Sequence, residues 1–150
     1  MNPTSKDLKW LKLTEEGAKL FSTCGKRQYF AIVLDNKGRC VGTGYNGGPS
    51  GAKHCVDGGC QRLIDKSPSG SNYDNCIAIH AEANALLHAS YSNGGTLYVN
   101  GPPCFQCMKM IANSGVKRIV HSASEDYADY PRIKSLATLW GLDIIEVKGS

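Results

Sequence analysis

Residues 96–121 read TLYVNGPPCFQCMKMIANSGVKRIVH, and this stretch decides the fold. Residues 96–99 form a short apolar segment that is typical of a buried strand, and the two adjacent prolines that follow favour the start of a helix. That helix is predicted to end near Gly115, directly before a second apolar segment over residues 118–121. A strand, a helix and a strand in this order predict two parallel strands joined by a crossover helix.

Flanking segments add further helices and strands on both sides of this unit. Residues 131–140 carry apolar residues at helical spacing, and residues 143–147 predict a last strand. Upstream, two apolar segments joined by a tight turn predict an antiparallel hairpin over residues 29–34 and 39–45. The other two predicted helices cover residues 4–21 and 79–91.

Together these elements predict an α/β fold in a single domain over residues 1–150. Strands that alternate with helices pair in parallel, whereas the upstream hairpin is antiparallel, so the predicted sheet is mixed. We therefore expect a three-layer α/β/α sandwich around a five-stranded mixed sheet. A segment rich in glycine and cysteine, at about residues 46–76, interrupts the pattern, and we expect an insertion there that something must organise.

The composition is that of an ordinary globular protein and limits the classes of function. Of the 150 residues, 41% are hydrophobic and 20% charged, and the formal net charge is +4 without any run of lysines and arginines. This mild charge fits a solvated surface or a small anionic ligand such as a phosphate, and it argues against a nucleic-acid partner. No apolar segment approaches the ~20 residues of a membrane span, so we expect no membrane partner and a cytoplasmic location, the host cytoplasm for a viral protein.

Two short motifs with metal-ligating side chains lie at the starts of two predicted helices. His80 stands in the sequence HAE, and Cys104 and Cys107 stand in PCFQC. One imidazole and two thiolates are good zinc ligands, and a site with three protein ligands keeps a fourth position for water. Because a strand separates the two helix starts, we expect the three side chains to converge on one ion. Seven cysteines in a chain without a recognisable secretory signal favour metal ligation or catalysis over disulfides.

Glu82 is the candidate proton carrier of this site. It follows His80 by two residues on the first turn of a helix, so its carboxylate can lie beside the metal without binding it. There it can take a proton from a water molecule and pass it to a substrate nitrogen. The order H-x-E followed by P-C-x-x-C is the signature of zinc-dependent nucleobase deaminases. The alternative is a purely structural zinc on the C-x-x-C pair, with an accidental His-x-Glu.

Further segments carry a resemblance to one enzyme family. The matching residues are Ser22, Thr23, Cys24 and Arg27, and then residues 43–47, 49–51, 80–85, 95–99 and 103–107. Through them the chain, from Ser22 onward, resembles the deoxycytidylate (dCMP) deaminase family of the cytidine deaminase superfamily. The zinc motif alone is shared with cytidine, guanine and tRNA-adenosine deaminases, whereas Gly44-Tyr45-Asn46-Gly47 matches the deoxycytidylate branch.

The resemblance implies a cytidine deaminase-like fold and zinc-dependent hydrolytic deamination of dCMP. Water would attack C4 of the cytosine to give ammonia and dUMP, the precursor for thymidylate synthesis. The resemblance further implies homo-oligomers, hexamers in particular, with dCTP and Mg²⁺ as activator and dTTP as inhibitor. The alternative substrate is another cytosine nucleotide or nucleoside, such as dCTP or deoxycytidine.

The resemblance also implies a role for individual residues. His80, Cys104 and Cys107 would bind zinc, and Glu82 would be the proton shuttle. The implied substrate contacts are Asn46 at the sugar, Arg27 at the 5′-phosphate, Ala81 and Tyr127. The implied effector-binding residues are Gly44, Tyr45, Asn46 and Gly47. Phe30 departs from the family, which usually has glycine there, and we expect it to alter the packing beside the substrate.

Four of the remaining cysteines flank or occupy the glycine-rich segment. A second, structural zinc there would have the ligands Cys24, Cys55, Cys60 and Cys76, with His54 as a substitute. The alternative is that these thiols are reduced and unligated. Cys40 lies in a predicted strand and is expected to be a small buried apolar residue. His88 and His121 are expected to be surface or internally hydrogen-bonded histidines.

Two other classes of function stay open. One is deamination of a different base, for example an adenosine in RNA, although the sequence has no basic stripe for a nucleic acid. The other is a zinc-binding module without enzymatic activity that senses a nucleotide through the segment around Asn46. Glu82 argues against the second class, because a module that only binds has no need of that carboxylate.

Overall fold

The computed structural model describes residues 2–23, 28–51, 78–124 and 127–148. Several predicted site residues lie outside these ranges: Cys24, Arg27, His54, Cys55, Cys60 and Cys76. The same is true of most of the predicted insertion at residues 46–76. The fold and the site are therefore built from the two helix starts, the sheet and the segments that join them.

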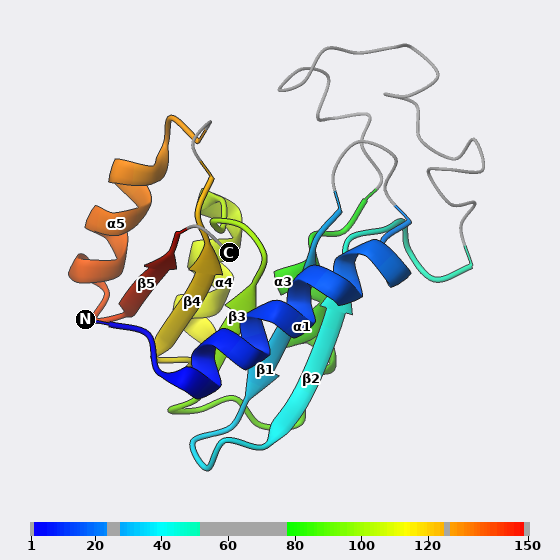
Figure 1. Ribbon diagram of the computed structural model, residues 1–150, viewed down its shortest axis with the longest axis horizontal. Helices are drawn as coiled ribbons and strands as arrows, with labels where there is room; N and C mark the ends of the chain where they lie inside the picture. Colours follow the sequence, from blue (N-terminus) through cyan, green and yellow to red (C-terminus); the bar gives the residue numbers. More distant parts are fainter. Residues whose placement is uncertain (1, 24–27, 52–77, 125–126, 149–150) are drawn as a thin grey trace.

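One sheet of five strands runs through the described part of the chain, in the order β2-β1-β3-β4-β5 (Figure 1). β1 (Phe30–Leu34) pairs antiparallel with both β2 (Cys40–Tyr45) and β3 (Thr96–Val99). β4 (Arg118–Ser122) lies parallel between β3 and β5 (Asp143–Val147). The sheet is mixed, as predicted, because the hairpin precedes the two strand–helix–strand units.

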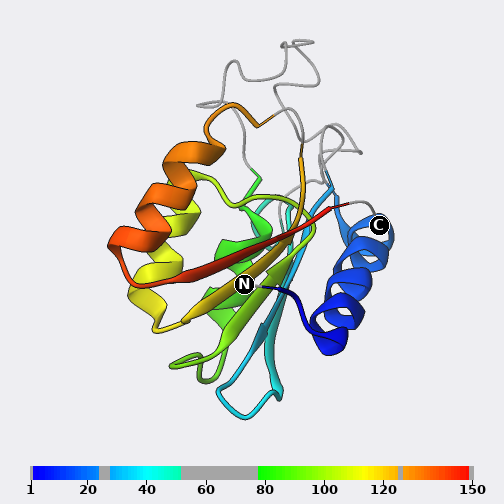
Figure 2. The ribbon, with the colours of Figure 1, turned by 60° about the vertical axis from the view of Figure 1, so that its left-hand side comes forward.

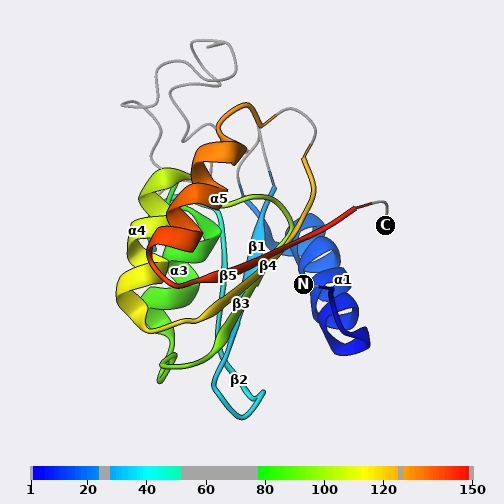
Figure 3. The same cartoon turned by 90° about the vertical axis from the view of Figure 1, so that its left-hand side faces the viewer.

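Helices cover both faces of this sheet (Figures 2 and 3). α1 (Ser5–Phe21) covers one face, and the other carries α3 (Ala81–His88), α4 (Phe105–Ser114) and α5 (Tyr130–Leu139). The predicted three-layer α/β/α sandwich is confirmed. In the described residues, no helix is both long and apolar enough to cross a membrane.

Successive side chains along each strand point to opposite faces of the sheet, and they contribute to two separate apolar cores. Leu97, Val99 and Ile119 belong to the core beneath α3, α4 and α5, whereas Tyr98 and Val120 belong to the core beneath α1. This alternation follows from the two-residue period of a strand. The face with three helices is the one on which the metal-ligating motifs lie.

The end of α3 is earlier than predicted. The helix ends at His88 rather than Tyr91, and the backbone N–H of Ser90 donates to the carbonyl oxygen of Val41 in β2, at 3.2 Å. A hydrogen bond to a neighbouring strand has replaced the helical one. Such a contact between distant residues leaves no trace in the helical period of the sequence.

Two expectations about the hairpin were wrong. Cys40 is exposed rather than buried, because it is the first residue of β2, which lies at an edge of the sheet. Phe30 lies on the α1 face, where a Cβ on Gly17 would come within 2.8 Å of its ring, so this phenylalanine fills the space left by a glycine. Its neighbour Ala31 faces the other core, and Phe30 therefore does not alter the packing on the side of the metal-ligating motifs.

Candidate active site

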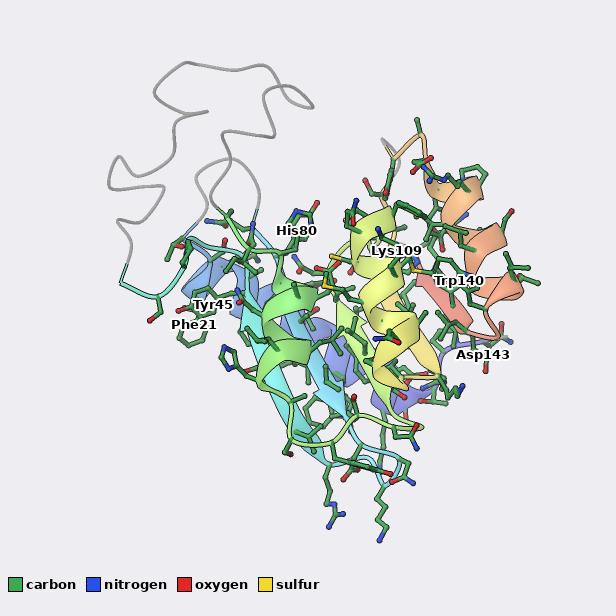
Figure 4. The ribbon with its side chains drawn as sticks, turned by 180° about the vertical axis from the view of Figure 1, so that it is seen from behind. Phe21, Tyr45, His80, Lys109, Trp140 and Asp143 are labelled. Atoms are coloured by element: carbon green, nitrogen blue, oxygen red, sulfur yellow. The ribbon has the colours of Figure 1, made fainter. Side chains whose placement is uncertain are left out.

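The three predicted metal ligands converge. One ligand atom from each of His80, Cys104 and Cys107 lies within 4.8 Å of the other two, and this is the one such group found among the described residues. His80 Nδ1 lies 3.3 Å from Cys107 Sγ and 3.4 Å from Cys104 Sγ. Figure 4 shows His80 at the ends of α3 and α4, with sulfur atoms close by.

Local backbone structure explains why these side chains point to one another. His80 and Cys104 are the N-cap residues of α3 and α4, both with extended backbone, and neither side chain caps its own helix. Cys107 lies on the first turn of α4, and its side chain is buried. The carboxyl end of β3 leads into α4 through residues 100–104, so the strand between the two motifs brings the helix starts together.

The electrostatics of the cluster favour one shared negative charge on the two thiols. A hydrogen bond with Cys107 holds the pKa of the Cys104 thiol well below its usual range, and His80 lowers it further. The hydrogen bond between the two thiol groups, together with burial, raises the pKa of the Cys107 thiol. The hydrogen bond between the His80 ring and the Cys104 sulfur raises the pKa of His80. Thiolates at helix N-termini are stabilised by the helix dipole, and one imidazole with two thiolates is a donor set that fits zinc.

Glu82 lies beside this cluster on the first turn of α3. Its side chain is buried, and burial raises its pKa, although interactions with its own backbone N–H and with His80 oppose the shift. Among the described residues, no lysine or arginine forms a salt bridge with it. A carboxyl group whose pKa is raised by burial can exchange a proton at modest cost, which is what a general acid and base requires.

A backbone bridge between Gly47 and Ile79 brings Asn46 close to His80, because each of these two residues is next in the chain to a bridged residue. Gly47 and Ile79 exchange two backbone hydrogen bonds, of 3.2 and 2.7 Å, and Ile79 directly precedes His80. The side-chain oxygen of Asn46 accepts from the Ser22 hydroxyl at 2.6 Å and from the Tyr29 backbone N–H at 2.8 Å. Asn46 is thereby fixed at the junction of α1, β1 and the end of β2.

Two of the predicted effector-binding residues, Gly44 and Tyr45, contact α3 and the end of α1 respectively. A Cβ on Gly44 would clash with the backbone nitrogen of Ala85, so the glycine lets α3 pack directly on β2. Tyr45 is exposed and stacks on Phe21, with ring centroids 6.1 Å apart. Gly44 thus has a packing reason of its own, whereas Tyr45 is presented to solvent.

Two other predicted substrate contacts, Ala81 and Tyr127, fall on the same side of the sheet as the three predicted metal ligands. Ala81 is fully buried at the start of α3. Tyr127 packs against the core that contains Cys107, and burial, followed by charge at Cys104, raises its pKa to about 12. Arg27 lies outside the described residues.

Sequence reasoning missed the contacts that hold these residues in place. The bridge from Gly47 to Ile79 and the hydrogen bonds from Ser22 and Tyr29 to Asn46 join residues that are 17 or more positions apart. Gly42 and Gly44 were a signal for a different contact, the close approach of α3 to β2, because a glycine in a strand often marks a close backbone approach.

Comparisons with known proteins agree with this geometry. Residues 4–123 match the family described as "Cytidine and deoxycytidylate deaminase zinc-binding region". The chain is 42% identical over 107 residues to the deoxycytidylate deaminase of Mycobacterium phage D29, a match over 67% of this chain and 81% of that protein. It is 41% identical over 106 residues to the deoxycytidylate deaminase of Schizosaccharomyces pombe, which covers 69% of this chain but only 33% of the yeast protein.

A solved structure is similar over nearly the whole chain. It is the crystal structure of the dCMP deaminase from cyanophage S-TIM5 in complex with dCMP and dUMP. The TM-score is 0.76 at 28% sequence identity, and the match covers 98% of this chain and 99% of the other. The chain thus spans about a third of the yeast relative, most of the mycobacteriophage relative and almost all of the cyanophage structure.

Proposed function

We propose, from the premise that this chain belongs to the cytidine and deoxycytidylate deaminase family, that it is a zinc-dependent hydrolase that converts dCMP to dUMP and ammonia. The observation that carries the proposal is the convergence of His80, Cys104 and Cys107 beside the buried carboxylate of Glu82. The similarity to named deoxycytidylate deaminases supports dCMP as the substrate.

The ligands of the catalytic zinc would be His80, Cys104 and Cys107. Zinc held there would act as a Lewis acid that makes a water molecule nucleophilic near neutral pH. The side chains supply an imidazole and two sulfurs on two helix starts, and the strand and helices behind them fix their spacing.

Glu82 would move the protons of the reaction. Its carboxylate would accept one proton from the attacking water as the bond to C4 forms and would pass it to N3 of the cytosine. It would then take the second proton, from the new hydroxyl on C4, and pass it to the 4-amino group. The C4–N bond then breaks, and the 4-amino group leaves as ammonia. Burial next to the cluster keeps bulk water away from this exchange.

Substrate recognition would use residues on the rim of the same site. Asn46 would bind the sugar, which is supported by its place one residue from the bridge to Ile79. Arg27 would bind the 5′-phosphate, since a guanidinium fork suits phosphate geometry. Ala81 would lie against the base, and Tyr127 would cover it.

The remaining assignments are proposals that follow from the family. Gly44, Tyr45, Asn46 and Gly47 would bind the effectors, with dCTP and Mg²⁺ activating and dTTP inhibiting. The protein would act as a homo-oligomer, a hexamer in particular, in the cytoplasm, and would supply dUMP for thymidylate synthesis. A second, structural zinc would have the ligands Cys24, Cys55, Cys60 and Cys76.

The test compares dCMP, deoxycytidine and dCTP as substrates of zinc-replete protein, each with and without dCTP–Mg²⁺ or dTTP. We expect a strong preference for dCMP that the triphosphates modulate. Preference for deoxycytidine or dCTP would overturn the assignment of dCMP and leave a deaminase of another cytosine compound. Two zinc ions per chain after gentle purification would support the second site, and one would exclude it.

A further inference from the structure

His121 is a buried histidine that the proposed chemistry does not use. It is the second-last residue of β4 and has no solvent exposure. In the sheet it lies opposite Val99 of β3 and Glu146 of β5. Because Ile119, two residues earlier on the strand, belongs to the core beneath α3, α4 and α5, the side chain of His121 faces the same side as the metal-ligating cluster.

Both ring nitrogens of His121 have hydrogen-bond partners. Nδ1 lies 2.9 Å from the carbonyl oxygen of Ser122, and Nε2 lies 2.6 Å from the hydroxyl of Tyr130. A carbonyl oxygen can only accept, so Nδ1 carries the proton, and in the neutral ring Nε2 accepts from the Tyr130 hydroxyl. Burial lowers the pKa of His121, with the Ser122 bond and Glu146 opposing, and burial raises that of Tyr130 to about 12.

Tyr130 connects this bond to the active site. It is the first residue of α5, and its backbone N–H donates to the carbonyl oxygen of Tyr127 at 3.2 Å, which closes a turn. The rings of His121 and Tyr130 also meet edge to face, with centroids 5.1 Å apart. At the other end of the turn, Tyr127 packs against the core that includes Cys107. The turn is therefore held by β4 at one end. At its other end Tyr127 packs on the core that contains Cys107, close enough that, besides burial, charge at Cys104 raises the pKa of the Tyr127 hydroxyl.

We propose that His121 is a positioning residue for substrate binding: it accepts the Tyr130 hydroxyl and so fixes the turn that places Tyr127 beside the metal-ligating cluster. This inference rests on the proposed function of the site. An apolar side chain at position 121 would fill the same space but would offer no acceptor, so the hydroxyl of the half-buried Tyr130 would lose this partner. The hydrogen bond, rather than the volume of the imidazole, is the part of His121 that acts on the site.

The first experiment measures KM and kcat for dCMP with single variants of the full chain. Tyr130→Phe removes only the hydroxyl, whereas His121→Leu removes the acceptor together with the Nδ1 donor to Ser122 and the ring contact. We expect each to raise KM by about tenfold, the equivalent of one lost hydrogen bond, with kcat within about twofold of wild type. His121→Gln, which keeps an acceptor near the place of Nε2, should restore KM. Ile145→Val trims a buried side chain on the α1 face and should change neither constant.

A double-mutant cycle tests whether the effect passes through Tyr127. Tyr127→Ala should itself raise KM, and adding Tyr130→Phe to it should raise KM no further, because the turn then carries nothing to position. Unchanged KM in Tyr130→Phe, or a full further rise in the Tyr127→Ala background, would overturn the positioning role alone. Absence of dCMP turnover by the wild-type protein would overturn the proposed function and this inference with it.

Discussion

Two buried carboxylates lie on opposite faces of the same sheet, each in the first turn of a helix. Asp7 of α1 is 2% exposed and Glu82 of α3 is 5% exposed. Asp7 accepts hydrogen bonds from Arg118 at 2.8 Å, from the Tyr98 hydroxyl at 2.6 Å and from the Thr4 backbone N–H at 2.9 Å. Glu82 has no salt bridge to a lysine or arginine in the described part of the chain.

The pKa values of the two carboxyl groups are shifted in opposite directions because their hydrogen-bond donors differ, although both groups are buried. Burial alone would raise the pKa of Asp7, but the bonds from Arg118, Thr4 and Tyr98 outweigh it and hold that pKa well below its usual range. Burial of Glu82 meets weaker opposition, and its pKa is raised. Asp7 thus stays ionised and links α1 to β3 and β4 through Tyr98 and Arg118. Glu82 is protonated more readily, because its pKa is raised.

The largest effect we expect comes from removing a proposed metal ligand on the face of the sheet that carries Glu82. Cys107→Ser should lose the zinc of the cluster and all detectable dCMP turnover, because two ligands hold the ion far less well than three. Zinc content by atomic absorption and the rate of dUMP formation test this. Cys40→Ser is the matched control, since Cys40 is exposed on an edge strand, and it should keep both. Full zinc content and activity in Cys107→Ser would remove this residue from the ligand set.

The corresponding change on the other face should act on stability. Asp7→Asn leaves Arg118 without its carboxylate, and we expect a loss of about 2–4 kcal/mol in the free energy of unfolding. The folded variant should keep its rate on dCMP within about twofold. Denaturant titration at neutral pH tests this, with Glu16→Gln on the exposed face of α1 as a control that should shift stability by less than ~0.5 kcal/mol. A loss of turnover at unchanged stability would reverse the assignment of the two faces.

The stabilisation from Asp7 should also depend on pH in a defined direction. The pKa of Asp7 is lower in the folded chain than in the unfolded chain, so its contribution is complete above the unfolded value of about 4. It should decrease as the pH falls below that value. The gap in stability between wild type and Asp7→Asn should therefore narrow as the pH falls from about 4 to about 2. A gap that stays constant across this window would contradict the assignment.

The smallest effect we expect is that of a single donor to Asp7. Tyr98→Phe removes the hydroxyl and leaves Arg118, the Thr4 backbone N–H and the stacking of residue 98 on Trp10. The expected loss is about 1–2 kcal/mol in the free energy of unfolding, measured in the same titrations. A loss as large as that of Asp7→Asn would mean that the hydroxyl, not Arg118, dominates the site.

Much of the fold was predictable because its signals are local. Prolines before α4 and a glycine after it mark that helix, and alternation along β3 assigns Leu97 and Tyr98 to opposite faces. The metal-ligating cluster was predictable for the same reason: the spacing within HAE and PCFQC is short, and both motifs begin helices.

The rest depended on contacts between distant residues. The early end of α3, the fit of Phe30 on Gly17 and the anchoring of Asn46 each need two segments that only the folded chain brings together. The residues of the ion pair between Asp7 and Arg118 are 111 positions apart, so the sequence around either one does not indicate its partner. The sequence therefore predicted which side chains converge at the candidate site better than it predicted the contacts that hold them there.

The measurement that tests the account most directly is dCMP turnover and zinc content in the same preparation of Glu82→Gln protein. The amide keeps the shape of the side chain but cannot carry the proton. We expect turnover to fall by about 10²–10⁴-fold, with zinc content and the unfolding midpoint at least equal to those of wild type. Turnover near the wild-type rate in zinc-replete Glu82→Gln protein would contradict the account, because the carboxylate would then not be the proton carrier of this site.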